Sequence, residues 1–526
     1  MGSIIKHNIF VFKSFLVFLS FSTSSLVVIG QSPAHNFSSW NNYDPFFDTL
    51  LTNNIGDLSR MNSSVKPVLV NRKEALFNDS LLESELTKNR SDRFYIWPAA
   101  NLIAGNSVSE SFNGFSSRFG IGGAFSYSSR DERFHLRGTV LANTYSNDSL
   151  NDRRYEILEN SYFTDGDGGE IQPQFRASFN ANKFFQFQAG IDHNFIGEGD
   201  RSIILGDYTS PYPFFKIRSK LWRFEFVNIY QFLDENVEGN FIPKFTSSHY
   251  LNYNVTDRFS FGVFESVIYS PQDEYLTRGI EWEYLNPFIF YRPIEYGLGS
   301  QDKIVVGTNL SYSFDNLMLY GQFVLDEFVL NELVNRTRWW ANKYAGQIGL
   351  KGKFTNRKNQ FNYRTELNFA RPFTFAHLDE RTVYGHQGIP LGHPLGANFV
   401  ELFSTFSGKF TNDLMLTFEA MWVQQGGMDG TEEVTYGDDI YIPYTNRPTL
   451  PGTNTFQDYG YRIGGDGKLN RLRFSVEIDY PIYKKWNLHA FARPALEFQN
   501  GYSDNTVFMI FGGVKSSLWN ERSFRF

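Results

Sequence analysis

The chain has 526 residues, of which 41% are hydrophobic, 18% aromatic and 20% charged, and its formal net charge is -7. A modest negative charge without a basic stripe argues against nucleic acid as a partner. The absence of cysteine excludes disulfide scaffolds, thiol nucleophiles and cysteine-based metal sites. This aromatic-rich composition is typical of an outer-membrane barrel, although a secreted β-sandwich or propeller would also fit it.

The N-terminus has the features of an export signal. Two lysines lead into a short apolar core at Phe15–Phe21, and Gly30 places a small residue at the expected cleavage position. This apolar run is shorter than the roughly 20 residues that a membrane helix needs. We therefore expect residues 1–30 to be a signal peptide that is cleaved near Gly30 and Gln31.

Residues 31–92 do not have the pattern of barrel strands. Asn, Ser and Asp dominate through Ser64, and the only helical signal is Glu74–Leu86, where Phe77 and Leu81 form one i,i+4 apolar pair. We expect a small periplasmic or plug-like segment here. A flexible leader is the alternative.

From Arg93 onward, alternating strands are separated by turns rich in Gly, Asn and Asp. The clearest stretch is Leu469–Tyr480. Its apolar parity comprises Leu472, Phe474, Val476, Ile478 and Tyr480, and its polar parity comprises Arg471, Arg473, Ser475, Glu477 and Asp479. Period two indicates a strand with one apolar and one charged face. Because such strands recur with aromatics near their ends, we expect a wall with lipid outside and water inside.

The number of such runs is roughly 16 to 19, and even strand numbers prevail in bacterial single-chain barrels. The sequence therefore predicts an all-β fold, a transmembrane antiparallel β-barrel of about 18 strands over residues 93–526. The short turns Thr256–Asp257 and Asn412–Asp413 are expected to face the periplasm. The longest connections are expected to be extracellular or to fold into the lumen: Asn147–Ile171, Asn331–Asn342, Thr374–Gly396 and Gly426–Gly460.

One segment concentrates polar side chains that could carry chemistry. It contains Asp192, His193, Glu198, Asp200 and Arg201, with Gly197 and Gly199 allowing a sharp turn. Two carboxylates near a histidine could act as acid and base or hold a cation. Large barrels also contain charge networks that only stabilise the structure. We therefore expect these residues to form a structural polar cluster at the mouth or in the lumen of the barrel.

Other catalytic or metal-binding signals are weak. His377, His386 and His393 share one loop and could in principle bind zinc or copper, but their spacing is wide. The chain has no HExxH, GxSxG or phosphate-binding motif. We therefore expect no metal, no cofactor, no catalytic residue and no enzymatic activity.

Several sequence blocks together resemble a known family. They are Asn194–Ser202 with Pro211–Pro213, Tyr284–Glu295, Leu325–Phe328 followed by Trp339–Lys343, and His393–Asn398. In this order they resemble the Wzi-type capsule-assembly outer-membrane family, specifically its Bacteroidota branch, whose members include the gliding-motility protein RemB. The resemblance runs from about Ser63 to the C-terminus, and it implies an 18-stranded barrel with a small periplasmic helical segment.

Through the enteric members of the family, the resemblance implies a surface lectin that holds capsular polysaccharide on the cell. Through the Bacteroidota branch, it implies a function associated with gliding motility or with surface polysaccharide. The sugar-contacting loop residues of the enteric proteins have no counterparts here, so sugar binding is implied only for the family as a whole.

The leading hypothesis is a non-enzymatic barrel of the Gram-negative outer membrane that binds or organises surface polysaccharide or supports gliding motility and adhesion. Its partners would be outer-membrane lipid, surface polysaccharide and motility or cell-surface proteins. The candidate binding residues are Trp339, Trp340, Arg336, Arg338, Tyr436, Tyr441 and Tyr444. These aromatics could equally belong to the interfacial girdle of any such barrel. A porin-like channel is the alternative function, followed by an outer-membrane hydrolase.

Overall fold

The computed structural model describes residues 64–66, 93–110, 113–131, 133–147, 168–237, 240–271, 279, 281–286, 302–431 and 434–516. The expected signal peptide and nearly all of the expected segment 31–92 lie outside these residues. Among the described residues, no helix has the length and apolar character that crossing a bilayer requires.

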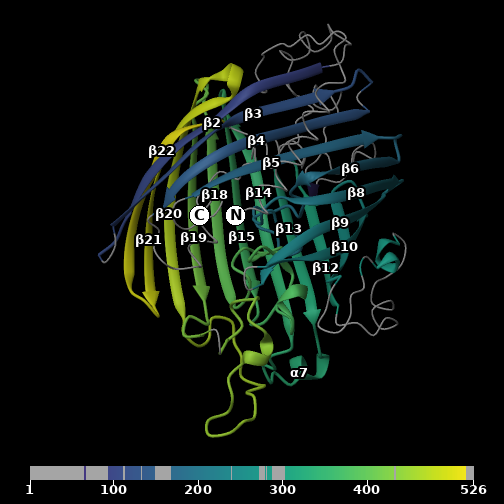
Figure 1. The fold of residues 1–526 in the computed structure, drawn as a ribbon, viewed down its shortest axis with the longest axis vertical. Coiled ribbons are helices and arrows are strands. Elements are labelled where there is room, and N and C mark those ends of the chain that lie inside the picture. Colours follow the sequence, from purple (N-terminus) through teal and green to yellow (C-terminus); the bar gives the residue numbers. More distant parts are fainter. Residues whose placement is uncertain are drawn as a thin grey trace.

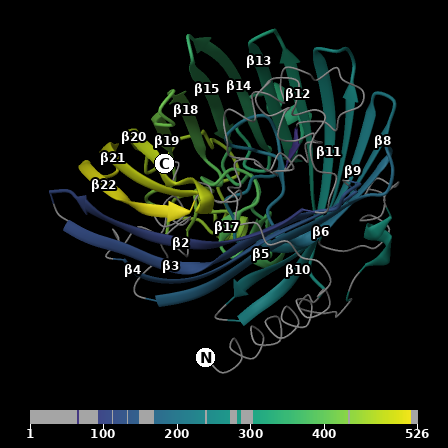
Figure 2. The same ribbon diagram turned by 90° about the horizontal axis from the view of Figure 1, so that it is seen from above.

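Eighteen antiparallel strands close into one barrel, which confirms the all-β fold and the predicted strand number (Figures 1 and 2). Strand β2 closes the barrel by pairing with both β3 and β22. The strands are β2 (Arg93–Val108), β3 (Asn113–Ser128), β4 (Phe134–Asn147), β5 (Gly168–Asn180), β6 (Phe185–Asp192), β8 (Tyr212–Leu221), β9 (Phe224–Val237), β10 (Asn240–Asn254), β11 (Phe259–Tyr269), β12 (Lys303–Ser313), β13 (Leu317–Glu327), β14 (Lys343–Asn356), β15 (Asn359–Ala370), β18 (Phe399–Lys409), β19 (Met415–Gln425), β20 (Leu469–Tyr483), β21 (Leu488–Gly501) and β22 (Asn505–Ser516).

The strands place apolar side chains outside and polar side chains inside. On β20, the apolar residues from Leu472 to Tyr480 are 37–46% exposed, whereas the alternating polar residues from Arg471 to Asp479 are at most 9% exposed. This is the reverse of a water-soluble sandwich, in which the exposed face is polar. An apolar outer face around a closed barrel is the arrangement that a bilayer stabilises.

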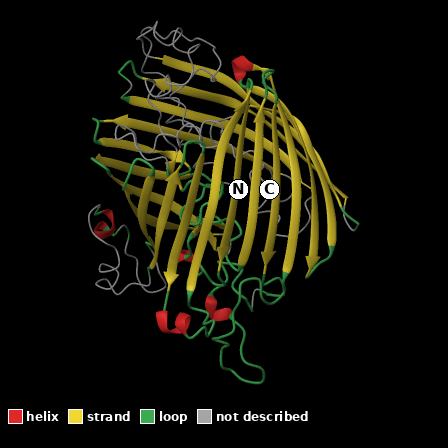
Figure 3. Cartoon of the chain, turned by 180° about the vertical axis from the view of Figure 1, so that it is seen from behind, coloured by secondary structure: helices red, strands yellow, loops and turns green. Residues whose placement is uncertain are grey.

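The two ends of the barrel differ in the length of their connections. At one end, the longest turns run only from 129 to 133 and from 410 to 414, and both Thr256–Asp257 and Asn412–Asp413 lie there. We call this the short-turn end. The connections at the opposite, long-loop end include residues 193–211, 328–342, 371–398 and 426–468 (Figure 3).

Two long connections enter the lumen and fill it. Residues 193–211, which contain β7 (Phe195–Ile196), follow the short strand β6, and residues 371–398 contain the hairpin of β16 (Gly385–His386) and β17 (Ile389–Pro390). We call these two connections the plug. The sequence left Thr374–Gly396 either extracellular or in the lumen, and the structure places this segment in the lumen, where Leu391 and His393 are fully buried.

The plug has an apolar centre. Its buried side chains, which include Ile203, Ile204, Phe375 and Leu391, pack with inward-facing wall residues such as Phe403 into one hydrophobic cluster. The two connections approach so closely that a Cβ added to Gly206 would lie 2.5 Å from the carbonyl oxygen of Gly392. The lumen is therefore a packed interior made of loops.

A short N-terminal strand also joins the plug. β1 (Val65–Lys66) pairs antiparallel with β7, and Ser64 donates its hydroxyl proton to Glu198 Oε1 at 2.8 Å. Of the segment expected to be periplasmic or plug-like, these three described residues thus contact the plug directly.

One patch of the outer wall departs from the apolar pattern. Asn228, His249 and Glu265 lie side by side on β9, β10 and β11, on the lipid-facing parity, yet each is at most 8% exposed. The 3-10 helix η3 (Trp282–Leu285) lies outside the barrel beside this patch (Figure 3). Leu285 accepts a hydrogen bond from Tyr230 at 2.9 Å. The segment shields polar groups that lipid could not satisfy.

Candidate functional site

Five aromatic rings gather at the long-loop end, and we call them the rim cluster: Trp339, Trp340, Phe373, Tyr444 and Tyr461. Trp340 lies against Tyr444 with ring centroids 4.7 Å apart, and it meets Phe373 edge-on at 6.0 Å. Phe373 in turn contacts Tyr461 at 5.1 Å. The rings come from three connections, 328–342, 371–398 and 426–468, so only tertiary folding assembles them.

Two cations lie over these rings. Lys343 Nζ is 4.4 Å from the centre of Tyr444 and 5.1 Å from that of Trp340, and the Arg447 guanidinium is 4.5 Å from Trp340. Glu327 pairs with Lys343 at 3.0 Å, and Asp458 with Arg447 at 2.7 Å. The rim cluster therefore combines flat apolar faces with ion-paired polar groups, which suits a ligand that has rings and hydroxyl groups.

Backbone hydrogen bonds hold the two outer connections together. Trp340 N donates to Asp458 O at 2.9 Å, and Tyr461 N donates to Arg338 O at 3.1 Å. Arg371, at the start of the plug connection, donates to the carbonyl oxygens of Trp339 and Tyr461 at 3.2 and 3.4 Å. Burial, followed by the Glu327 carboxylate, raises the pKa of Tyr444. Its hydroxyl therefore remains a neutral donor at physiological pH.

The structure brings only some of the candidate binding residues together. Trp339, Trp340 and Tyr444 meet in the rim cluster, whereas Tyr441 donates its hydroxyl proton to Ile389 O at 3.2 Å and packs against the plug. Tyr436 is partly exposed, and its carbonyl oxygen accepts a hydrogen bond from Asn398.

Arg336 and Arg338 are exposed beside the rim cluster. The cations that lie over its rings are instead Lys343 and Arg447, which sequence reasoning missed. Lys343 lies close to Trp339 and Trp340 in the sequence, so their proximity could have been noticed. Arg447 is far from the two tryptophans in the sequence, and no sequence pattern indicates their contact.

The polar cluster separates into three groups inside the barrel, which are Asp192 with the adjacent His193, then Glu198, and finally Asp200 with Arg201. Asp192 accepts from Arg176 Nε at 2.8 Å and from Arg137 Nη2 at 3.5 Å. His193 Nε2 donates to the carbonyl oxygen of Thr209 at 2.6 Å. Glu198 accepts from Lys351 Nζ at 2.9 Å. The Asp192 contacts join strands of the wall, the His193 contact lies within the plug, and the Glu198 contact ties the first half of the plug to β14 of the wall.

Asp200 and Arg201 form the third group. Asp200 pairs with Arg201 Nη1 at 3.0 Å, and both backbone N–H groups donate to Glu366 of β15. Arg201 Nε also pairs with Glu401 of β18 at 3.4 Å, and His393 contacts the same carboxylate at 2.8 Å. Glu401 therefore links the two halves of the plug. Each carboxylate has basic partners and is buried, so the arrangement is suited to holding the plug in place.

The three histidines of the plug do not converge. His377 Nδ1 lies 2.7 Å from the Thr382 hydroxyl, His386 Nδ1 contacts the backbone of Asp234, and His393 contacts Glu401. Burial lowers the pKa of His377 to about 3, so its ring is neutral at physiological pH. Within the described ranges, no group of three His, Asp or Glu residues is placed to hold a metal ion.

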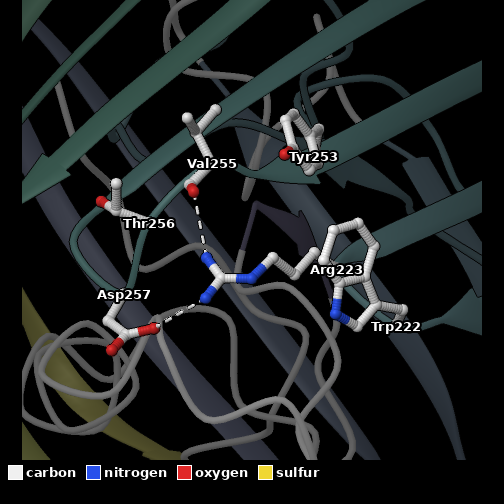
Figure 4. Close-up of a pocket in the computed structure, with 6 residues that line it drawn as sticks. All are labelled: Trp222, Arg223, Tyr253, Val255, Thr256 and Asp257. Atoms are coloured by element: carbon white, nitrogen blue, oxygen red, sulfur yellow. Dashed lines mark hydrogen bonds and ion pairs between the residues drawn. The ribbon is translucent and has the colours of Figure 1, made fainter.

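A shallow pocket lies at the short-turn end, between the β8–β9 and β10–β11 turns (Figure 4). Arg223 crosses it and donates to Val255 O at 3.0 Å, and its guanidinium lies 3.7 Å from Asp257. Trp222 and Tyr253 form its aromatic edge. The arginine braces two neighbouring turns, and the aromatics occupy the position of an interfacial girdle.

No family model matches the chain, and no curated protein matches it. Among solved structures, Wzi of Escherichia coli has 10% identical residues and a TM-score of 0.53, over 90% of this chain and 98% of Wzi. The chain has a Wzi-like barrel fold. Wzi is described as an outer-membrane protein involved in group 1 capsule assembly and as a carbohydrate-binding β-barrel.

Two structures from Pseudomonas aeruginosa are less similar. OprD has 10% identity and a TM-score of 0.39 over 79% of this chain and 94% of its own. OccK7 (OpdD) has 8% identity and a TM-score of 0.42 over 81% of this chain and 98% of its own. No conclusion rests on these two similarities.

We expect the connection 426–468 to tolerate shortening only at its tip. Residues 451–455 are exposed and closed off by the hydrogen bond from Leu450 N to Thr455 O, so replacing them with two glycines should leave the barrel unchanged. Deleting 431–449 should instead lower the unfolding temperature, because Ile440 is part of the buried plug cluster. Heat-modified gel migration and thermal unfolding measure both outcomes, and equal losses for the two variants would contradict this division.

Proposed function

We propose that this protein is a non-enzymatic barrel of the Gram-negative outer membrane that binds or organises surface polysaccharide at its long-loop end. The observation that carries the proposal is the rim cluster, in which the partly exposed rings of Trp340 and Tyr444 pack together and against Lys343 and Arg447. Aromatic faces offer apolar surface to sugar rings, and the exposed Arg336 and Arg338 beside the rim cluster attract carboxylates. The proposed ligand is therefore an acidic surface polysaccharide such as a capsule.

The position of the rings supports binding over a purely interfacial role. Trp339 and Trp340 precede β14 in a connection between strands, and Trp340 contacts Phe373 of the plug. Girdle aromatics project outward from the wall toward the membrane interface, whereas Trp340 packs against a connection that enters the lumen. The resemblance to the Wzi-type family, and the carbohydrate binding named for Wzi, point in the same direction.

A porin-like channel is the second candidate function, and the charged inner wall favours it. The plug opposes it, because Ile203, Ile204, Phe375 and Leu391 are fully buried inside the lumen. A passive pore needs a continuous aqueous path, and the buried cluster of described plug residues occupies part of the lumen through which that path would run. A binding role needs only the outer rim and is compatible with the filled lumen.

We also propose how the protein reaches the outer membrane and which end of the barrel faces outward. Residues 1–30 would direct export, and the long-loop end would then face the outside of the cell, because long loops are extracellular in such barrels. Polysaccharide held there would support adhesion and gliding motility, with motility or cell-surface proteins as further partners.

Trp340→Ala and Tyr444→Ala should each weaken binding of acidic polysaccharide about tenfold or more, because each removes a large face from the centre of the site. Purified refolded barrel on a glycan array, followed by titration with the best ligand, measures the change. The matched control is Trp222→Ala, which removes the same side chain at the short-turn end, where it is 61% exposed. Equal effects of the Trp340 and Trp222 variants would refute the rim cluster as the binding site.

A further inference from the structure

The barrel wall contains a lysine that is buried without a partner. Lys216 is 0% exposed, and among the residues that the structure describes its Nζ has no hydrogen-bond partner. It lies midway along β8, on the lumen-facing parity and directly opposite Gln188 of β6. The amide of Gln188 is already engaged, because its Oε1 accepts from Arg176 at 2.9 Å and its Nε2 donates to Gln186 at 2.6 Å.

Other cations surround this lysine. Arg218 is two residues further along the same face of β8, and the charges of Arg176 and Arg218 both act on Lys216. Both guanidiniums are 0% exposed. Arg137 lies directly opposite Arg176 in the register of β4 and β5. The charges of Asp192 and Glu225 also act on Lys216, but the hydrogen bonds that these carboxylates accept come from the arginines.

The pairing of those carboxylates can be followed atom by atom. Asp192 accepts from Arg176 at 2.8 Å and from Arg137 at 3.5 Å. Glu225 accepts from Arg218 Nε at 3.0 Å and from Nη2 at 2.5 Å. Counting these described residues, four basic side chains (Arg137, Arg176, Lys216 and Arg218) stand against two carboxylates, so this buried part of the wall holds two more basic groups than acidic ones.

Such a surplus is unfavourable without an anion. A buried ammonium group needs an opposite charge or hydrogen-bond acceptors to compensate for lost hydration, and the neighbouring guanidiniums increase the cost of its charge. Guanidinium and ammonium groups together form a typical oxyanion site, since guanidinium presents paired donors and ammonium supplies a compact charge.

We propose that Lys216, with Arg176 and Arg218, forms a binding site for a compact oxyanion such as phosphate, sulfate or a carboxylate group. The site lies between the plug and the wall made by β5, β6 and β8, since Arg176 Nη2 donates to the carbonyl oxygen of His193 in the plug. Arg218 Nη1 also donates to Val65 O of β1, which pairs with the plug, at 3.4 Å. The bound anion neutralises the wall and holds the plug against it. This site is separate from the rim cluster and does not depend on polysaccharide binding there.

Thermal unfolding of the full-length refolded barrel in a phosphate titration at constant ionic strength tests the proposal. The wild-type melting temperature should rise and saturate, by about 1.5 °C at ten times the dissociation constant. Lys216→Met should lose this saturable rise. It should also melt above the wild type in anion-poor buffer, because the uncompensated charge is gone. The two curves should therefore cross as phosphate is added.

Two controls separate site binding from a general salt effect, because phosphate stabilises many proteins by exclusion from their surfaces. Lys409→Met removes an exposed lysine from the end of β18 and should respond as the wild type does. Lys216→Gln serves the same purpose as Lys216→Met should the methionine variant fail to fold. A parallel rise in the wild type and the Lys216 variants, or no saturable rise in any of them, overturns the site.

Sulfate and glucuronate in the same titration identify the source of the oxyanion. A response to phosphate and sulfate alone assigns a free inorganic ion, and a response to glucuronate as well assigns the carboxylate group of a sugar acid. Both results need the site, since both disappear in Lys216→Met.

Discussion

Val476→Arg is expected to lower the free energy of unfolding by about 2–4 kcal/mol, because it places a guanidinium on the lipid-facing side near the bilayer midplane. Val476 is at the centre of β20, is 37% exposed and lies opposite Phe418 on the outer face. Urea unfolding of the barrel in lipid vesicles, followed by tryptophan fluorescence, measures the loss.

The matched control is Ile482→Arg on the same strand. Ile482 is also exposed on the outside but lies near the short-turn end, where an arginine reaches the interface and costs only about 0–1 kcal/mol. Equal costs at positions 476 and 482 would be evidence against a bilayer around this wall.

Strand parity alone predicts a small cost for Ser475→Arg, because Ser475 faces the lumen. The structure changes this expectation. The Ser475 hydroxyl donates to Glu419 Oε2 at 3.2 Å and accepts from Arg493 Nη2 at 3.3 Å, so a new guanidinium would meet Arg493 in a buried site.

Glu401→Gln is expected to release the plug and give the barrel a measurable ion conductance. Glu401 is fully buried and pairs with Arg201 from one half of the plug and with His393 from the other. Breaking a buried ion pair costs about 3–5 kcal/mol, which would favour the open lumen by about 100-fold or more. Planar-bilayer recordings compare the variant with the wild type, which we expect to be almost silent.

Glu477→Gln is the corresponding control. Glu477 is also an inward-facing wall carboxylate and pairs with Arg493 and Lys515, which belong to β21 and β22 rather than to the plug. It should lose some stability without gaining conductance. Strong conductance of the wild type would favour the channel function, and equal conductance of the two variants would show that Glu401 does not hold the plug.

The sequence by itself determined the wall of this protein. In a strand, the face on which a side chain lies depends only on odd or even position, so Leu472 and Val476 could be assigned to lipid and Arg471 to the lumen without any partner strand. Repetition of that pattern between turns also predicted the strand number. The short-turn end and the long-loop end could also be predicted, because the length of each connection is read directly from the sequence and consecutive connections alternate between the two ends.

Only the tertiary structure decided what those connections do. The sequence predicted Thr374–Gly396 to lie either outside the barrel or in the lumen. Its burial depends on the volume available inside the barrel and on distant partners such as Ile204 of the other plug connection. The contact between Trp340 and Tyr444 joins segments about a hundred residues apart, so no local period encodes it.

The outer wall of β9, β10 and β11 shows the same limit. His249 has lipid-facing parity, but it is buried beside η3, which a period of two cannot predict. Periodicity specifies the face of the strand on which a side chain lies. Whether that side chain is exposed depends on which distant segment of the chain packs against that face.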